Sequence, residues 1–217
     1  MKIIKTEGIT YLTLVPDGTT EWYYGMNYEH GDLYEAEEML KEGLPMEGNR
    51  LILVHYPDGE VYEPVAKEAG MYSGTPVFYN DGIFILNVDF TKRIIRIFRF
   101  DCQTYACSLE TELSLSAVKD CYNLQLHTAP LCLTRQGGES RFELIWPEKA
   151  SFAINVHESF FLRDGERLYF NKWYEEGEAE TYRYWEETVV RDLNGKQIEV
   201  LPGDLQVMPN GEIWNIR

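Results

Sequence analysis

The sequence predicts an all-β protein made of short antiparallel strands and hairpins. Aromatic residues, which favour the pleated, half-buried surface of a sheet, are abundant: 15 Tyr, 10 Phe and 5 Trp in 217 residues. The dipeptides Asp-Gly and Asn-Gly also recur, and these residues tolerate the positive φ of tight hairpin turns. They occur at Asp17-Gly18, Asp58-Gly59, Asp81-Gly82, Asp164-Gly165, Asn194-Gly195 and Asn210-Gly211.

The strands between these turns follow from the pattern of apolar residues. In residues 83–90, Phe84, Leu86 and Val88 share one face, and the other face also begins with apolar residues. A strand that is apolar on both faces is typical of the buried centre of a sheet. Residues 94–100 then return as its partner. Further strands are predicted over residues 142–146, 151–156, 160–162, 167–174, 181–191, 198–201 and 212–216.

One segment favours a helix instead. Asp32 is a suitable N-cap, and Glu35, three residues later, completes an approximate capping box. Apolar residues then recur at helical spacing, and Gly43 lies where a C-terminal cap is expected. The pattern predicts a short helix over residues 33–42.

The order of the strands resembles the β-propeller class. The clearest unit has an inner strand at 75–79, a tight turn, two middle strands at 83–90 and 93–101, and an outer strand at 108–114. Several turn signals lie roughly 40–45 residues apart, which is the length of a four-stranded blade. The resemblance implies a single all-β domain over residues 1–217 with about five small blades. No WD dipeptide marks a named family, and a β-sandwich remains the alternative.

The charge balance argues against several classes of partner. There are 36 acidic and 20 basic residues, giving a net charge of −16. Such a surface repels nucleic-acid phosphates and anionic lipids, so we expect neither nucleic acid nor membrane as a partner. The N-terminal residues lack the cleavage site of a signal peptide, which predicts a soluble, cytoplasmic protein.

No metal or cofactor is expected. The four cysteines form no C-x-x-C pair, and their spacing matches no zinc pattern. His157 and Glu158 begin like a zinc-protease motif, but Phe161 stands where the second histidine would be required. Phosphate-binding glycine motifs are also absent from the sequence.

The propeller resemblance predicts a binding face. In a propeller, the loops that enter the inner strands and those that leave the second strands lie on the same side of the ring. Concave surfaces with a few convergent polar groups are the default ligand sites. The ligand-binding residues predicted on this face are Tyr72, Ser73, Asp89, Thr91, His157, Glu158, Trp173 and Tyr174.

The sequence favours a non-catalytic binding or interaction protein whose ligand is a protein, a peptide or a carbohydrate. The alternative is a glycoside hydrolase, with Asp89 and Glu158 as its paired carboxylates. The aromatic faces of Trp173 and Tyr174, next to the acidic loop that follows them, suit sugar rings or cationic groups. Alternatively, this loop only solvates a hairpin tip, with Trp173 and Trp185 paired across the strands.

Overall fold

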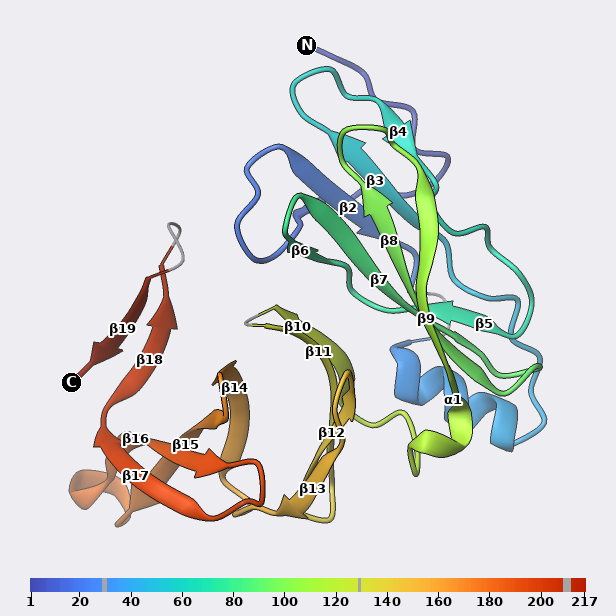
Figure 1. The fold of residues 1–217 in the computed structure, drawn as a ribbon. Coiled ribbons are helices and arrows are strands. Elements are labelled where there is room, and N and C mark those ends of the chain that lie inside the picture. The colour runs from blue at the N-terminus through green and yellow to red at the C-terminus, as the bar shows by residue number, and fades with distance from the viewer. Residues whose placement is uncertain (29–30, 129, 209–211) are drawn as a thin grey trace. The chain divides into compact units, whose positions relative to one another are not determined.

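The computed structural model describes residues 1–28, 31–128, 130–208 and 212–217. The chain is built almost wholly from antiparallel strands in several small sheets (Figure 1), which confirms the predicted all-β class. It divides into two compact units, Met1–Leu126 and His127–Arg217. Within the described residues, no helix has the length and apolar character needed to cross a bilayer.

The first unit contains two sheets of consecutive strands. One has the order β1-β2-β3-β4, and in the other β5 and β6 both pair with β7, followed by β8 and β9. The bounds are β1 (Thr13–Leu14), β2 (Trp22–Met26), β3 (Leu51–His55), β4 (Val61–Tyr62), β5 (Met71–Ser73), β6 (Val77–Tyr79), β7 (Gly82–Asp89), β8 (Ile94–Asp101) and β9 (Cys107–Ser114).

The second sheet confirms the predicted central strand and refines its neighbours. Every residue of β7 is buried. The predicted inner strand at 75–79 is shorter, because β6 pairs with only the first half of β7 while β5 pairs with the second half. The segment 74–76, which contains Pro76, separates the two. Proline cannot donate a ladder hydrogen bond, which accounts for the interruption.

The tight turn before β7 lies one residue earlier than the Asp81-Gly82 pair predicted. Tyr79 pairs with Gly82, so the two loop residues are Asn80 and Asp81, at φ 45° and 58°. Positive φ at both positions is the mark of a type I′ hairpin turn. At position 82 a Cβ would lie 2.8 Å from Nε of Arg99, so the flexible Arg99 side chain would have to shift if Gly82 were replaced.

The predicted helix is present as α1 (Leu33–Lys41) and lies beside β5 (Figure 1). The Glu35 backbone N–H donates to Oδ1 of Asp32 at 2.8 Å, and the Asp32 backbone N–H donates to the Glu35 carboxylate at 2.8 Å. This reciprocal pair is the capping box expected from the sequence. A short 3₁₀ helix, η1 (Leu115–Ala117), follows β9.

The remaining sheets also use consecutive strands. Their orders are β10-β11-β12-β13, β14-β15-β16-β17 and β18-β19, with β10 running across the boundary between the units. The bounds are β10 (Leu124–Thr128), β11 (Leu131–Gly137), β12 (Arg141–Trp146), β13 (Ala150–Ala153), β14 (Glu158–Asp164), β15 (Arg167–Glu176), η2 (Ala179–Thr181), β16 (Arg183–Asp192), β17 (Gln197–Pro202), β18 (Asp204–Val207) and β19 (Ile213–Ile216).

Each unit has its own aromatic packing. In the second unit, Phe142 lies 4.8 Å from Phe160 and 5.1 Å from Phe170 between ring centroids. In the first unit, the buried rings of Trp22 and Phe100 meet edge to face at 5.3 Å. Aromatic pairs at these separations add to the free energy of burying their surface.

Two smaller expectations have different outcomes. The predicted pairing of Trp173 with Trp185 is wrong, because Trp185 lies opposite Tyr174 and Trp173 lies opposite Glu186. The turn predicted at residues 210–211 lies outside the described residues.

Candidate functional site

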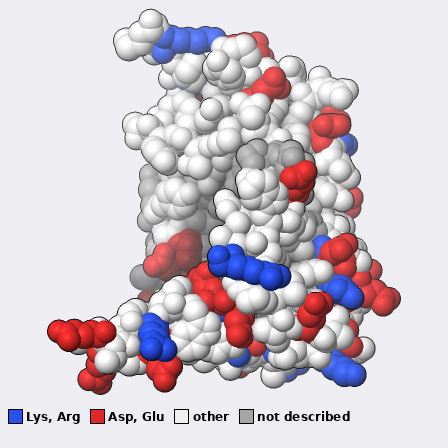
Figure 2. Space-filling view, turned by 90° about the vertical axis from the view of Figure 1, so that its left-hand side faces the viewer, with Lys and Arg blue, Asp and Glu red and all other residues white. Residues whose placement is uncertain are grey.

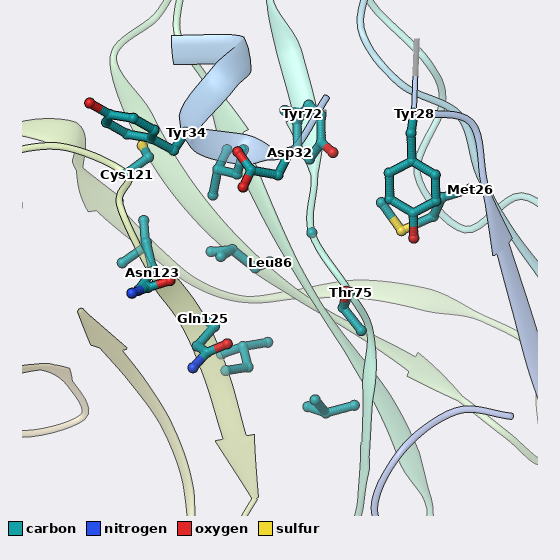
Figure 3. Close-up of a pocket in the computed structure, with 15 residues that line it drawn as sticks. Met26, Tyr28, Asp32, Tyr34, Tyr72, Thr75, Leu86, Cys121, Asn123 and Gln125 are labelled. Carbon is teal, nitrogen blue, oxygen red and sulfur yellow. The ribbon is translucent and has the colours of Figure 1, made fainter. Parts of the chain in front are cut away.

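A cavity of about 220 Å³ opens in the first unit, close to the start of α1. Figure 3 shows tyrosine rings and polar side chains arranged around it. Its floor is apolar, and Leu86 of the central strand β7 lies in the middle of it. The described residues that line the cavity are Met26, Tyr28, Asp32, Leu33, Tyr34, Tyr72, Gly74, Thr75, Val77, Leu86, Cys121, Asn123, Leu124, Gln125 and Leu126.

Three tyrosines from different parts of the unit form its aromatic lining. Tyr72 of β5 is buried, and its hydroxyl donates to the Gly31 carbonyl at 2.7 Å. Burial and nearby acidic groups raise the Tyr72 pKa, which keeps this hydroxyl protonated. Tyr34 of α1 packs edge to face against Tyr122 at 5.2 Å. Tyr28 is mostly exposed. Burial of the remaining part of this residue, together with the nearby Tyr24, raises the Tyr28 pKa.

The polar lining consists of Asp32, Thr75, Asn123 and Gln125. The capping box orients Asp32, because one carboxylate oxygen accepts the Glu35 N–H. In Figure 3 the Asp32 carboxylate points toward the space between the tyrosines. Together these groups offer hydroxyl, amide and carboxylate partners within one small space.

The cavity has few charged groups. Among the described lining residues, Asp32 is the one acidic side chain, and none is Lys, Arg or His. Elsewhere the protein is strongly charged, and the face in Figure 2 carries more acidic than basic side chains. The described lining thus offers neither a carboxylate pair nor an imidazole for general acid–base chemistry. The arrangement is suited to holding a ligand.

Of the predicted site residues in the first unit, only Tyr72 lines the cavity. Ser73 is adjacent on β5 and therefore faces the opposite side of the sheet. Its hydroxyl accepts from the Asn87 amide at 3.0 Å, and its backbone N–H donates to the Asn49 side-chain oxygen at 2.7 Å. Ser73 thus belongs to a buried polar network within the unit.

Asp89 is the last residue of β7, and Thr91 lies in the turn that follows. The Asp89 carboxylate accepts the Lys92 backbone N–H at 2.8 Å and lies 3.3 Å from the Lys92 ammonium. Burial raises the Asp89 pKa, but the hydrogen bonds and charge of Lys92, with the charge of Arg96, outweigh it and hold this pKa below its ordinary value. Thr91 is exposed in the same turn.

The other four predicted residues lie together around β14 and β15. The His157 ring stacks on Trp173 at 3.9 Å. Glu158 accepts two hydrogen bonds from Arg191, at 2.9 and 3.0 Å. Tyr174 stacks on Trp185 at 5.0 Å. Of these four side chains, the structure brings His157 and Trp173 into contact with each other. Glu158 and Tyr174 instead contact Arg191 and Trp185, which were not predicted.

Sequence reasoning missed most of the cavity. Asp32 was interpreted only as a helix cap, although the same carboxylate lines the cavity. A usable signal is the alternation in residues 123–126, where polar Asn123 and Gln125 alternate with Leu124 and Leu126. This pattern is typical of a strand with one face exposed, and all four of these residues line the cavity.

Comparison with known proteins leaves the family open. No protein-family model and no curated protein matches the chain. Among solved structures, the chain is similar to one described as a dipeptidyl aminopeptidase IV from Bacteroides ovatus, with 8% identity and a TM-score of 0.40. The match covers 86% of this chain and 38% of that one. A similarity this low carries no argument about function.

Proposed function

We propose that the protein is a non-catalytic carbohydrate-binding protein and that the cavity beside α1 holds a neutral sugar. The observation that carries this proposal is the composition of the cavity: tyrosines, planar polar side chains and an apolar floor within about 220 Å³. A sugar ring has apolar C–H faces and a rim of hydroxyls, and it therefore matches both kinds of lining.

The hydrogen-bonding groups support a sugar over a cation. Asp32 can only accept, whereas the amides of Asn123 and Gln125 both donate and accept. A sugar hydroxyl also donates and accepts, so it can use all of these groups. A cationic ligand offers donors alone, and the amide donors would gain nothing from it. An anionic ligand would face Asp32 without a cation among the described lining residues.

The glycoside hydrolase alternative has less support. A glycosidase needs a carboxylic acid with a raised pKa as the proton donor. The Asp89 pKa is lowered instead, and its carboxylate is held by Lys92. Glu158 is engaged on both oxygens by Arg191. These contacts support a stabilising role for both acids.

We also propose that the consecutive sheets are blades of a small propeller of about five blades, forming a single domain over residues 1–217. Antiparallel sheets of about four strands in chain order are the repeating unit of that architecture, whereas β-sandwiches use Greek-key connections between sheets. An experimental structure tests this proposal. Blades arranged around one axis would support it, and two facing sheets that exchange strands would refute it.

Calorimetric titration with neutral monosaccharides tests the proposed function. We expect saturable binding, and Gln125→Ala should raise Kd by roughly 2- to 10-fold, the loss of one or two hydrogen bonds. Gln125 is exposed, so this variant should fold normally. The matched control is Gln197→Ala, an exposed glutamine of β17 that does not line the cavity.

The dependence of Kd on salt concentration distinguishes a neutral sugar from a cationic ligand. Binding of a neutral sugar should keep the same Kd between about 0.05 and 0.5 M NaCl, because screening acts on charged pairs. Lack of binding by every neutral sugar, or binding that Gln125→Ala leaves unchanged, would refute the proposed function.

A further inference from the structure

A second cavity, of about 260 Å³, adjoins the first within the same unit. Met26 at the end of β2 and Tyr28 two residues later line both cavities. The second cavity adds Tyr11 and Tyr24, so aromatic side chains continue from one cavity into the next. Tyr28 thus forms a wall that the two cavities share.

Close packing of two chain segments builds the second cavity. A Cβ on Gly25 of β2 would lie 2.5 Å from the Ile9 side chain and 3.0 Å from the Tyr11 carbonyl oxygen. Glycine at this position therefore lets the segment around Tyr11 lie directly against β2. Tyr24, the third residue of β2, is buried and lines the second cavity together with Tyr28. The Tyr11 side chain is 76% exposed and accessible to a ligand.

The second cavity is uncharged. None of its described lining residues is Asp, Glu, Lys, Arg or His, although 26% of the chain is charged. Its polar groups are threonine and tyrosine hydroxyls and the Asn27 amide. A ligand that continues from the first cavity would therefore stay neutral and polar along its length.

The volumes of the two cavities also favour a ligand that spans both. Pockets for small molecules usually enclose about 300–1,000 Å³. Each cavity alone is smaller than this, at about 220 and 260 Å³, and the two together fall within the range. A ligand that spans both would contact aromatic side chains on each side of Tyr28.

We propose that the two cavities are adjacent subsites for a linear, neutral oligosaccharide, with one sugar on each side of Tyr28. This inference rests on the proposed function, because it assigns the first cavity to a sugar. It adds that the ligand is a chain of at least two residues and that Tyr11 recognises the second one.

The test is titration with gluco-, manno-, galacto- and xylo-oligosaccharides of one to five residues. In the series that binds best, we expect Kd to fall by at least about tenfold from one residue to two or three, since the second contact becomes intramolecular. Tyr11→Ala should abolish this gain and leave the monosaccharide Kd unchanged. Gln125→Ala should weaken binding at every length.

Tyr182→Ala is the matched control, since Tyr182 is an exposed tyrosine of the second unit, and it should bind like the parent protein. A Kd that does not change with chain length, or a length gain that survives Tyr11→Ala, would overturn the two-subsite inference and leave the proposed function intact. Weakened monosaccharide binding in Tyr11→Ala would also overturn it. If no saccharide of any length binds, the proposed function fails as well, and tight binding of a neutral peptide would assign the cavities to that class instead.

Discussion

Replacing Glu158 by alanine should destabilise the second unit by about 3 kcal/mol. The Glu158 side chain is 2% exposed and receives two hydrogen bonds from Arg191, whose side chain is 14% exposed. Removing one partner of a buried ion pair typically costs about 3–5 kcal/mol, because the remaining charge loses its counter-charge. Since Arg191 keeps some access to water and a bond to the Gly195 carbonyl, the lower end of that range applies.

Urea unfolding, monitored by tryptophan fluorescence, measures this loss of stability. Four of the five tryptophans, at positions 146, 173, 185 and 214, lie in the second unit, so the signal reports mainly on that part of the chain. For a unit of this size, the free energy of unfolding falls by about 1.5 kcal/mol per molar urea, so the urea midpoint should fall by about 2 M.

A double variant separates the ion pair from other effects of the mutation. Glu158→Leu combined with Arg191→Leu should recover most of the stability, since a well-packed apolar pair often equals a buried ion pair. About 1 kcal/mol of loss should remain from the unsatisfied Gly195 carbonyl. A midpoint for Glu158→Ala within about 0.3 M of the parent would refute this reasoning and would favour Glu158 as a functional acid.

Two further predictions concern the dependence of stability on pH. The folded Asp89 pKa lies below its ordinary value. Its contribution to the free energy of unfolding is therefore present above about pH 4 and is lost as pH falls through the folded pKa. Asp89→Asn keeps an acceptor for the Lys92 N–H and should flatten the pH dependence of the urea midpoint between about pH 5 and pH 2.5. Burial lowers the His127 pKa to about 4, so the unfolded chain binds an extra proton between about pH 6.5 and pH 4 and stability should fall as pH drops through that window. His127→Phe should remove this slope, and an unchanged slope in either variant would contradict the corresponding assignment.

Local signals in the sequence predicted the elements that depend on nearby residues. The helix α1 forms where Asp32 and Glu35 can cap each other, and this reciprocal contact involves residues only three positions apart. The buried strand β7 is evident because its apolar residues occupy both faces. The hairpin before it lies one residue earlier than the Asp81-Gly82 pair predicts, because Asn80 and Asp81 adopt the positive φ of the turn.

The candidate site was mostly missed because packing between distant segments assembles it. Its residues come from three separate segments of the chain, represented by Tyr28 and Asp32, by Tyr72 and by Gln125, and no local pattern links these segments. The propeller resemblance indicated Tyr72 and Ser73 together. Tyr72 lines the cavity, whereas its neighbour Ser73 points to the opposite face of β5 and joins a buried polar network there.

The distribution of charge separates the residues that stabilise this protein from those available to a ligand. The carboxylates of Asp89 and Glu158 are each about 2% exposed, and each is engaged by cationic groups of its own unit. Those partners offset the cost of burying a charge, and a ligand would have to break these contacts to use either acid. The two adjoining cavities contain a single carboxylate among their described residues, on Asp32. Under the proposed function, recognition there depends on tyrosine rings, amides and hydroxyls, which complement a neutral polyhydroxylated chain.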